Sequence, residues 1–312
     1  MEESSDNASA VIEDEKMPTD AKCHNTLQER AYLTFDCEWC DNILNTTPSK
    51  DKLESRLLRQ GFSRFLDVCE EQDAAGTIFV TAEVAPSVKD LLLRAVASGF
   101  EIGNHSKNHE SVAHMSIDQF TDDLKASTVI IEDTISRPVV SYRAPSFSMP
   151  IVLEYYEALA ACGYRFDYSA PLGNHMSGVH CDSSDLLTIL GSPTNVLTLP
   201  MVALGSNRNI FPGGGYFRVM PAWTLRELIS HNTTRWPVCL YFHPRDLLPI
   251  YVPRNTRNLK KLVKAAAGGI TPAAKLKKVL ASLNLMTTEN YHESCRLALS
   301  DLRESSGVQH GV

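Results

Sequence analysis

The chain has 312 residues, 43% of them hydrophobic and 21% charged, which is enough for one substantial globular domain. A formal charge of -7 and an isoelectric point near 5.8 give no electrostatic reason to expect a nucleic acid or an anionic membrane as partner. The sequence contains no run of 18 apolar residues, which excludes a transmembrane helix.

The first 28 residues are acidic and rich in Ser, Glu and Asp. This segment lacks the apolar centre of a secretory signal and predicts a disordered leader. The eight cysteines are scattered through apolar strand and helix patterns, a usage typical of reduced thiols rather than of a disulfide framework. We therefore expect a cytoplasmic protein.

Short apolar segments alternate with helical patterns through the rest of the chain. The seven predicted strands are Tyr32–Phe35, Thr77–Val80, Phe100–Ile102, Val140–Tyr142, Tyr164–Phe166, Val196–Leu199 and Val238–Phe242. Predicted helices cover 53–69, 88–96, Ile117–Thr134, Leu153–Cys162, Thr224–Ser230, Leu259–Ala267 and Pro272–Leu283. This alternation predicts an α/β fold, a distorted or incomplete parallel (β/α) barrel, over residues 29–285. Residues 286–312 are expected to form a C-terminal helix and tail.

Four side chains able to do chemistry fall at or just after the ends of predicted strands. They are Asp36, His105, Arg143 and His243. Because the carboxyl ends of barrel strands meet at one face, we expect these side chains to lie together in an active site.

His105 and His109 are four residues apart, and on a helix or helical turn this spacing puts both rings on one face. Two neutral imidazoles and one carboxylate can hold a divalent metal and leave positions open for water and substrate. The alternative is a pair of ordinary core or surface histidines.

Asp36 and Glu38 supply two acids at the end of the first predicted strand. One acid would bind the metal and the other would act as general base, unless both only cap the following helix. We favour Asp36 as base and Glu38 as ligand, with the reverse left open. Cys37 and Cys40 also form a C-x-x-C pair, which we interpret as a buried structural pair rather than a redox or zinc motif.

Arg143 and His243 complete the expected chemistry. An arginine beside the base carboxylate would keep that carboxylate ionised and oriented. An imidazole has a pKa suited to protonating a leaving amine, and Asp246 can orient the ring of His243. Alternatively, Arg143 could form an ordinary surface ion pair and His243 could only cap the end of its strand.

These motifs, in this order, resemble the polysaccharide deacetylase (NodB-homology, carbohydrate esterase family 4) family over most of residues 30–250. The common family form Thr-Phe-Asp-Asp is matched by Thr34-Phe35-Asp36, but Cys37 stands at the second Asp and an acid follows at Glu38. Branches with Asp-Val-Asp or Asp-Val-Glu-Asp have this spacing, which would turn residue 37 into the barrel wall. The glycine-rich segment 211–218 is similar to a family Ser-Gly-Gly-Gly-Tyr-Phe-Arg loop.

The resemblance implies hydrolysis of the N-acetyl group of an amino sugar, in a surface glycan such as O-antigen or exopolysaccharide or in its intracellular precursor. It implies one divalent metal, with zinc favoured over cobalt, nickel and manganese. It further implies that the backbone N–H of Ser146 binds the oxyanion and that Trp39, Gly214 and Tyr216 contact the substrate. The 211–218 loop could instead be only a tight structural turn. Two other functions stay open: an amidohydrolase of the same fold acting on a non-sugar amide, and an inactive carbohydrate-binding protein.

Overall fold

The computed structural model describes residues 30–40, 52–173, 181, 185–186, 194–205, 209–232, 234–249 and 272–306. Its centre is an eight-stranded sheet in which every described pair of strands is parallel. The strands are β1 (Arg30–Cys37), β2 (Gly76–Val80), β3 (Glu101–Asn104), β4 (Ser141–Tyr142), β5 (Phe166–Asp167), β7 (Leu197–Thr198), β9 (Val238–Phe242) and β10 (Asn284–Leu285).

The sheet curves into a barrel that stays open. Its order runs β10-β1-β2-β3-β4-β5-β7, and β9 pairs with β1. No pairing joins β9 to β7 in the part of the chain that the structure describes; a separate two-stranded sheet of β6 (Pro171–Leu172) and β8 (Met201–Val202) is present instead. The predicted incomplete parallel barrel is confirmed, with eight strands in the main sheet rather than about seven.

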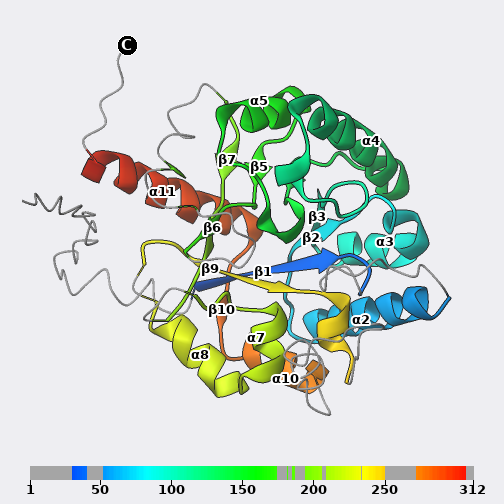
Figure 1. The fold of residues 1–312 in the computed structure, drawn as a ribbon. Coiled ribbons are helices and arrows are strands. Elements are labelled where there is room, and N and C mark those ends of the chain that lie inside the picture. Colours follow the sequence, from blue (N-terminus) through cyan, green and yellow to red (C-terminus); the bar gives the residue numbers. More distant parts are fainter. Residues whose placement is uncertain are drawn as a thin grey trace, which may run out of the picture.

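Helices surround this sheet (Figure 1). They are α2 (Lys52–Glu71), α3 (Lys89–Ala97), α4 (Ile117–Ile135), α5 (Leu153–Ala161), α7 (Gly214–Val219), α8 (Ala222–Ser230), α10 (Pro272–Leu280) and α11 (Thr288–Ser306). Six of the seven predicted helices are found within a few residues of their expected ends, and the seventh, Leu259–Ala267, lies outside the described residues. None of the described helices is long and apolar enough to cross a membrane.

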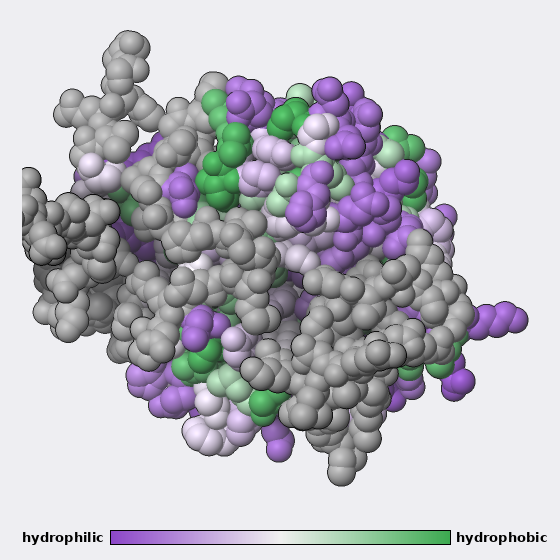
Figure 2. Space-filling model, viewed as in Figure 1, coloured by the Kyte–Doolittle hydropathy of each residue, from purple (hydrophilic) through white to green (hydrophobic). Residues whose placement is uncertain are grey.

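The amphipathic pattern explains how α4 packs. Its N-terminus is closed by a capping box in which the Ser116 hydroxyl accepts a hydrogen bond from the Gln119 N–H, and the Gln119 side chain accepts one from the Ser116 N–H. Phe120, Leu124 and Ile131 are fully buried against the sheet. The opposite face of the helix is mainly hydrophilic in Figure 2.

Buried side chains form two clusters, one on each side of the barrel wall. Strand β1 shows the alternation: Leu33, Phe35 and Cys37 belong to the outer cluster under the helices, whereas Tyr32 belongs to the inner cluster. Helix α11 contributes to the inner cluster, where Tyr291 stacks on Tyr32 with ring centroids 4.2 Å apart. The C-terminal helix therefore helps to fill the interior of the open barrel.

Candidate active site

The two acids at the end of β1 lie on the inner face of the barrel wall. Because strand side chains alternate, Asp36 follows Tyr32 and Thr34 inward, while Cys37 points into the outer cluster. Glu38, just after the strand, is also almost fully buried at 1% exposure. The spacing of two residues therefore directs both carboxylates to one site.

Glu38 lies against two imidazoles. Its Oε2 contacts Nε2 of His109 directly and is 3.8 Å from Nε2 of His105. The candidate ligand atoms of the three residues all lie within 4.8 Å of one another. The Nδ1 of His105 is 2.7 Å from the carbonyl oxygen of Arg143, which can only accept, so Nδ1 carries the proton and the Nε2 lone pair is left for a ligand.

The charges of these residues suit a cation. Burial raises the pKa of Glu38, but the neighbouring His109, His243 and His105 outweigh it, so that the pKa lies below its ordinary value. Burial lowers the pKa of His105 to about 4, which keeps that ring neutral at physiological pH. Burial also lowers the pKa of His109, but contact with Glu38 outweighs it and raises the value, so a metal ion would displace a proton there. An ionised carboxylate and imidazole donors fit a divalent cation.

The expected helical turn between the two histidines is wrong. Residues 105–109 form a loop in which Ser106 (φ 68°) and His109 (φ 62°) adopt left-handed backbone conformations. The Ser106 carbonyl accepts a hydrogen bond from the Ala82 N–H at 3.0 Å, which fixes the loop to the segment after β2. The rings therefore converge through two backbone reversals, with centroids 5.3 Å apart, rather than through helical periodicity.

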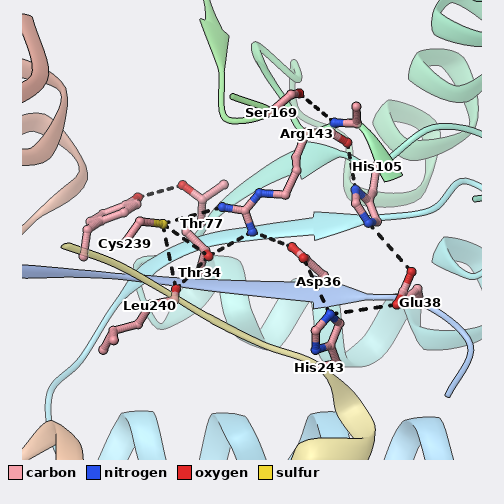
Figure 3. A network of polar contacts seen from close by, with 12 residues as sticks. Thr34, Asp36, Glu38, Thr77, His105, Arg143, Ser169, Cys239, Leu240 and His243 are labelled. Carbon is pink, nitrogen blue, oxygen red and sulfur yellow. Dashed lines mark hydrogen bonds and ion pairs between the residues drawn. The ribbon is translucent and has the colours of Figure 1, made fainter. Parts of the chain in front are cut away.

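Asp36 is held by a fully buried arginine (Figure 3). Nη1 of Arg143 donates to Oδ1 of Asp36 at 2.6 Å and to the Thr34 hydroxyl at 2.9 Å. Burial alone would raise the pKa of Asp36, but Arg143, with His105 and His243, lowers it. The arginine therefore keeps Asp36 ionised at neutral pH.

His243 faces both acids from β9. Its Nδ1 is 2.9 Å from Oδ2 of the fully buried Asp246, whose pKa stays low because the contact with His243 outweighs burial. This ionised carboxylate fixes the Nδ1 proton, and Nε2 points to Oδ2 of Asp36 at 3.8 Å and Oε1 of Glu38 at 4.0 Å (Figure 3). The structure thus brings together Asp36, Glu38, His105, His109, Arg143, His243 and Asp246.

The backbone around His243 is fixed by helix α2. The 3-10 turn Pro244–Leu247 follows His243 and packs so closely on α2 that a Cβ at Gly61 would lie 2.0 Å from the Pro244 carbonyl oxygen. Glycine is required there because any larger residue would displace the turn.

The side chains of two residues expected to contact the substrate do not point to the seven residues of the site. Trp39 is only 6% exposed and lies in the outer cluster, where its Nε1 has no hydrogen-bond partner among the described residues. The Ser146 side chain is exposed, and its backbone is left-handed (φ 54°) in the 3-10 turn Pro145–Phe147. The expected roles of both residues stay predictions.

The expected loop at 211–218 is wrong in part, because helix α7 begins at Gly214. A Cβ at Gly213 (φ 147°) would lie 1.9 Å from the carbonyl oxygen of Tyr241, and one at Gly214 would lie 3.1 Å from the Tyr241 hydroxyl. These glycines allow close packing on β9, as in the structural alternative. The Tyr216 hydroxyl donates to the carbonyl of Asn209 at 2.9 Å.

Tyr241 and Phe147 are aromatic neighbours of the site that the sequence analysis did not single out. The Tyr241 ring is half-buried and lies edge-on to His243 at 5.4 Å and to Phe147 at 5.7 Å between centroids. The alternation of β9 was the available signal, since residues 239, 241 and 243 share one face of a strand.

Known protein families match two regions of the chain. Residues 24–166 match a family model described as polysaccharide deacetylase, and residues 170–293 match a domain of unknown function, DUF3473. An uncharacterized 30.6 kDa protein of Geobacillus stearothermophilus is 30% identical over 83 residues, which are 27% of this chain and 31% of that protein. The chain therefore aligns with about a third of the length of this relative.

One solved structure shares the fold over nearly the whole chain. A Mycobacterium smegmatis protein assigned as a polysaccharide deacetylase superposes with a TM-score of 0.54 at 16% identity, covering 92% of this chain and 94% of that one. A family 4 carbohydrate esterase from Bacillus anthracis is 27% identical, covering 46% of this chain and 61% of that one, with a TM-score of 0.35. Residues 24–166 are therefore similar to polysaccharide deacetylases, and the whole barrel shares the fold of the Mycobacterium smegmatis protein.

Proposed function

We propose that this protein is a metal-dependent deacetylase that hydrolyses the N-acetyl group of an amino sugar, in a surface polysaccharide or in its precursor. The similarity of residues 24–166 to polysaccharide deacetylases supports a hydrolase of amide bonds with a glycan substrate. The observation that supports the proposal most is the convergence of Glu38, His105 and His109 beside the pairs Asp36–Arg143 and His243–Asp246.

Glu38, His105 and His109 would hold the metal. The buried Oε2 of Glu38, which faces the Nε2 atoms of His109 and His105, and the unprotonated Nε2 of His105 are the donors such an ion requires. A bound divalent ion would supply Lewis-acid stabilisation of the negative charge that develops on the amide oxygen. Two imidazoles with one carboxylate suit zinc, and cobalt, nickel and manganese are the alternatives.

Asp36 would act as general base. Its Oδ1 is occupied by Arg143, while Oδ2 faces the side where His243 lies. Oδ2 would take a proton from the attacking water as the water oxygen bonds to the acetyl carbon. Arg143 supports this role because it keeps the carboxylate ionised in a buried setting.

His243 would act as general acid. Its Nε2 would give a proton to the amide nitrogen as the carbon–nitrogen bond breaks, which releases a free amine and acetic acid; the acid then loses its proton to solvent as acetate. Asp246 would hold the ring orientation and stabilise the imidazolium before the transfer. The proton taken by Asp36 then balances the one that His243 has lost.

A sugar is favoured over a small acid as substrate. The half-buried ring of Tyr241 beside His243 offers aromatic surface to a pyranose ring, and the guanidinium of Arg143 is engaged by Asp36. Glu38 also favours an active enzyme over an inactive binding protein. Cys37 points into the outer cluster, and Glu38 supplies the carboxylate that lies between the two histidines.

The test is acetate release by protein with and without metal. The protein would be stripped with a chelator, reloaded with zinc, cobalt, nickel or manganese, and given N-acetylamino sugars, their lipid-linked or nucleotide-linked forms, glycan oligomers and non-sugar acetamides. Metal-dependent acetate release from an N-acetyl sugar is expected. If acetate is released only from the non-sugar acetamides, the substrate is a non-sugar amide instead. If the protein binds one metal ion but releases acetate from none of the compounds, the proposal that it is an enzyme is wrong.

A further inference from the structure

Cys239 in β9 lies behind the arginine of the site. It is fully buried and shares the inward face of the strand with Tyr241 and His243. It belongs to the inner cluster, with Tyr32 of β1 and Tyr291 of α11. Its thiol therefore reaches the catalytic group from within the barrel rather than from the substrate side.

The thiol contacts the half of the Arg143 guanidinium that faces away from Asp36. Nη2 of Arg143 is 3.6 Å from the sulfur, within the range of a hydrogen bond to sulfur (Figure 3). The sulfur is also 3.7 Å from the Thr34 hydroxyl oxygen and 3.9 Å from the Leu240 carbonyl oxygen. The S–H can donate to that carbonyl, which leaves a sulfur lone pair for Nη2.

The two ends of the guanidinium have unequal partners. Nη1 has the carboxylate of Asp36 and the hydroxyl of Thr34, whose own proton goes to the Leu240 carbonyl at 2.8 Å. Among the described residues, the sulfur is the one hydrogen-bond partner of Nη2, and Asp36 is the one carboxylate in ion-pair contact with Arg143. The Phe79 ring covers the guanidinium at 4.3 Å.

A weak, neutral acceptor at Nη2 has a specific consequence. A carboxylate there would share the positive charge, and an apolar side chain would leave Nη2 free to rotate or to seek water. A buried thiol holds the planar group without competing for its charge. We propose that Cys239 is a positioning residue, which fixes the Arg143 guanidinium so that Nη1 meets Asp36. This inference rests on the proposed function.

The kinetic test uses Cys239→Ala, with Cys69→Ala as the matched control. Cys69 is an equally buried thiol on α2, in the outer cluster. Cys239→Ala should lower kcat on the N-acetyl substrate about 10–100-fold, the cost of a misplaced catalytic group, with KM within about twofold and metal content unchanged. Cys69→Ala should keep kcat even if it lowers the thermal midpoint similarly. Cys239→Ser, which keeps an acceptor, should recover part of the loss.

A double-mutant cycle separates positioning from general damage. In an Arg143→Lys background, Cys239→Ala should cause no further loss of kcat, because the group that it positions is gone. Equal losses in both backgrounds would overturn the proposal. If Cys239→Ala does not fold, Cys239→Ser against Cys239→Val carries the same comparison.

A readout without turnover keeps this inference distinct from the proposed function. In protein labelled with ¹³C and ¹⁵N at arginine, the Nη signals of Arg143, assigned by their loss in Arg143→Lys, report rotation of the guanidinium. Restricted, separate signals in the native protein that merge in Cys239→Ala would support the proposal even if no acetyl substrate were turned over. Unchanged signals in Cys239→Ala would overturn it, whether or not the enzyme is active.

Discussion

The two matched regions of the chain are built differently, and the active-site candidates are divided between them. Residues 24–166 contain the eight-residue β1 and the helices α2 and α4, and they carry Asp36, Glu38, His105, His109 and Arg143. In their described part, residues 170–293 contain the five-residue β9, four two-residue strands, helices of six to nine residues and the start of α11, and they carry His243 and Asp246. The proposed metal ligands and base thus come from regular barrel, and the proposed acid comes from its irregular completion.

Strand pairing joins the two regions at the site. Residues Ala31–Phe35 of β1 pair in parallel with Val238–Phe242 of β9, so the acids that follow one strand and the histidine that follows the other emerge side by side. The second region therefore contributes to the active site through a single strand, β9, which places His243 beside the acids. Mutations in the two regions should therefore separate metal binding from proton donation.

The largest effect should come from losing the metal. His105→Ala should abolish stoichiometric metal binding and lower activity by at least the roughly 10³-fold that several kcal/mol of charge stabilisation represents. Elemental analysis and acetate release measure both. His114→Ala, an exposed histidine nearby, is the control and should change neither. Full metal occupancy in His105→Ala would remove this residue from the ligand set.

The two acids should then divide in function. Asp36→Asn should keep the metal and lose activity about 10²–10⁴-fold, the typical contribution of a general base. Glu38→Gln should lose metal as well as activity. Metal content and turnover of both variants decide the matter: the opposite pattern would exchange their roles, and full activity in both would contradict the catalytic assignment.

Changes in the second region should spare the metal. His243→Ala should keep metal and fold, lose about 10²-fold or more on the N-acetyl substrate, and lose less on an activated aryl acetate, because an amine must be protonated to leave. The ratio of amide to ester rates is the measurement. The exposed His231→Ala is the control. Equal losses on both substrates would mean that His243 only supports its strand.

The smallest effect should come from the contact between the regions. Gly61→Ala should lower the free energy of unfolding by about 1–3 kcal/mol, as overpacking does, because its methyl group would meet the backbone of Pro244. Denaturant unfolding measures this loss, and metal affinity should be unchanged. Ser63→Ala on the same helix is the control. A neutral result for Gly61→Ala would show that the turn after His243 moves freely.

The regular half was predictable from sequence because its signals are periodic. The alternation in β1 and the helical pattern of α2 both extend over enough residues to distinguish a strand from a helix. The two-residue strands β6 and β8 are too short to show an alternation of buried and exposed residues. Helix α7 begins at glycines that are typical of a loop. Periodicity therefore misses these elements of the second region, although it predicted β9, α8 and α10 there.

The site was predictable as a set of residues but not in its geometry. Strand ends predicted which side chains could meet, since chain order and barrel topology suffice for that. The left-handed conformations of Ser106 and His109 depend on backbone contacts with the segment after β2, and no residue type announces them. The role of Cys239 behind Arg143 likewise depends on a pairing 96 residues apart in the chain.

The position of Cys37 has a consequence for recognising related enzymes. Two acids in adjacent strand positions would point to opposite sides of a wall, so in a regular strand a second carboxylate joins the first only after a step of two. In this chain the two acids therefore meet because they are two positions apart, with Cys37 between them facing the other side of the wall. Position 37 is left to the hydrophobic wall, where Val or Ile would serve as well. Searches that score each column separately would count such chains as defective, whereas a search for same-face acids would retain them.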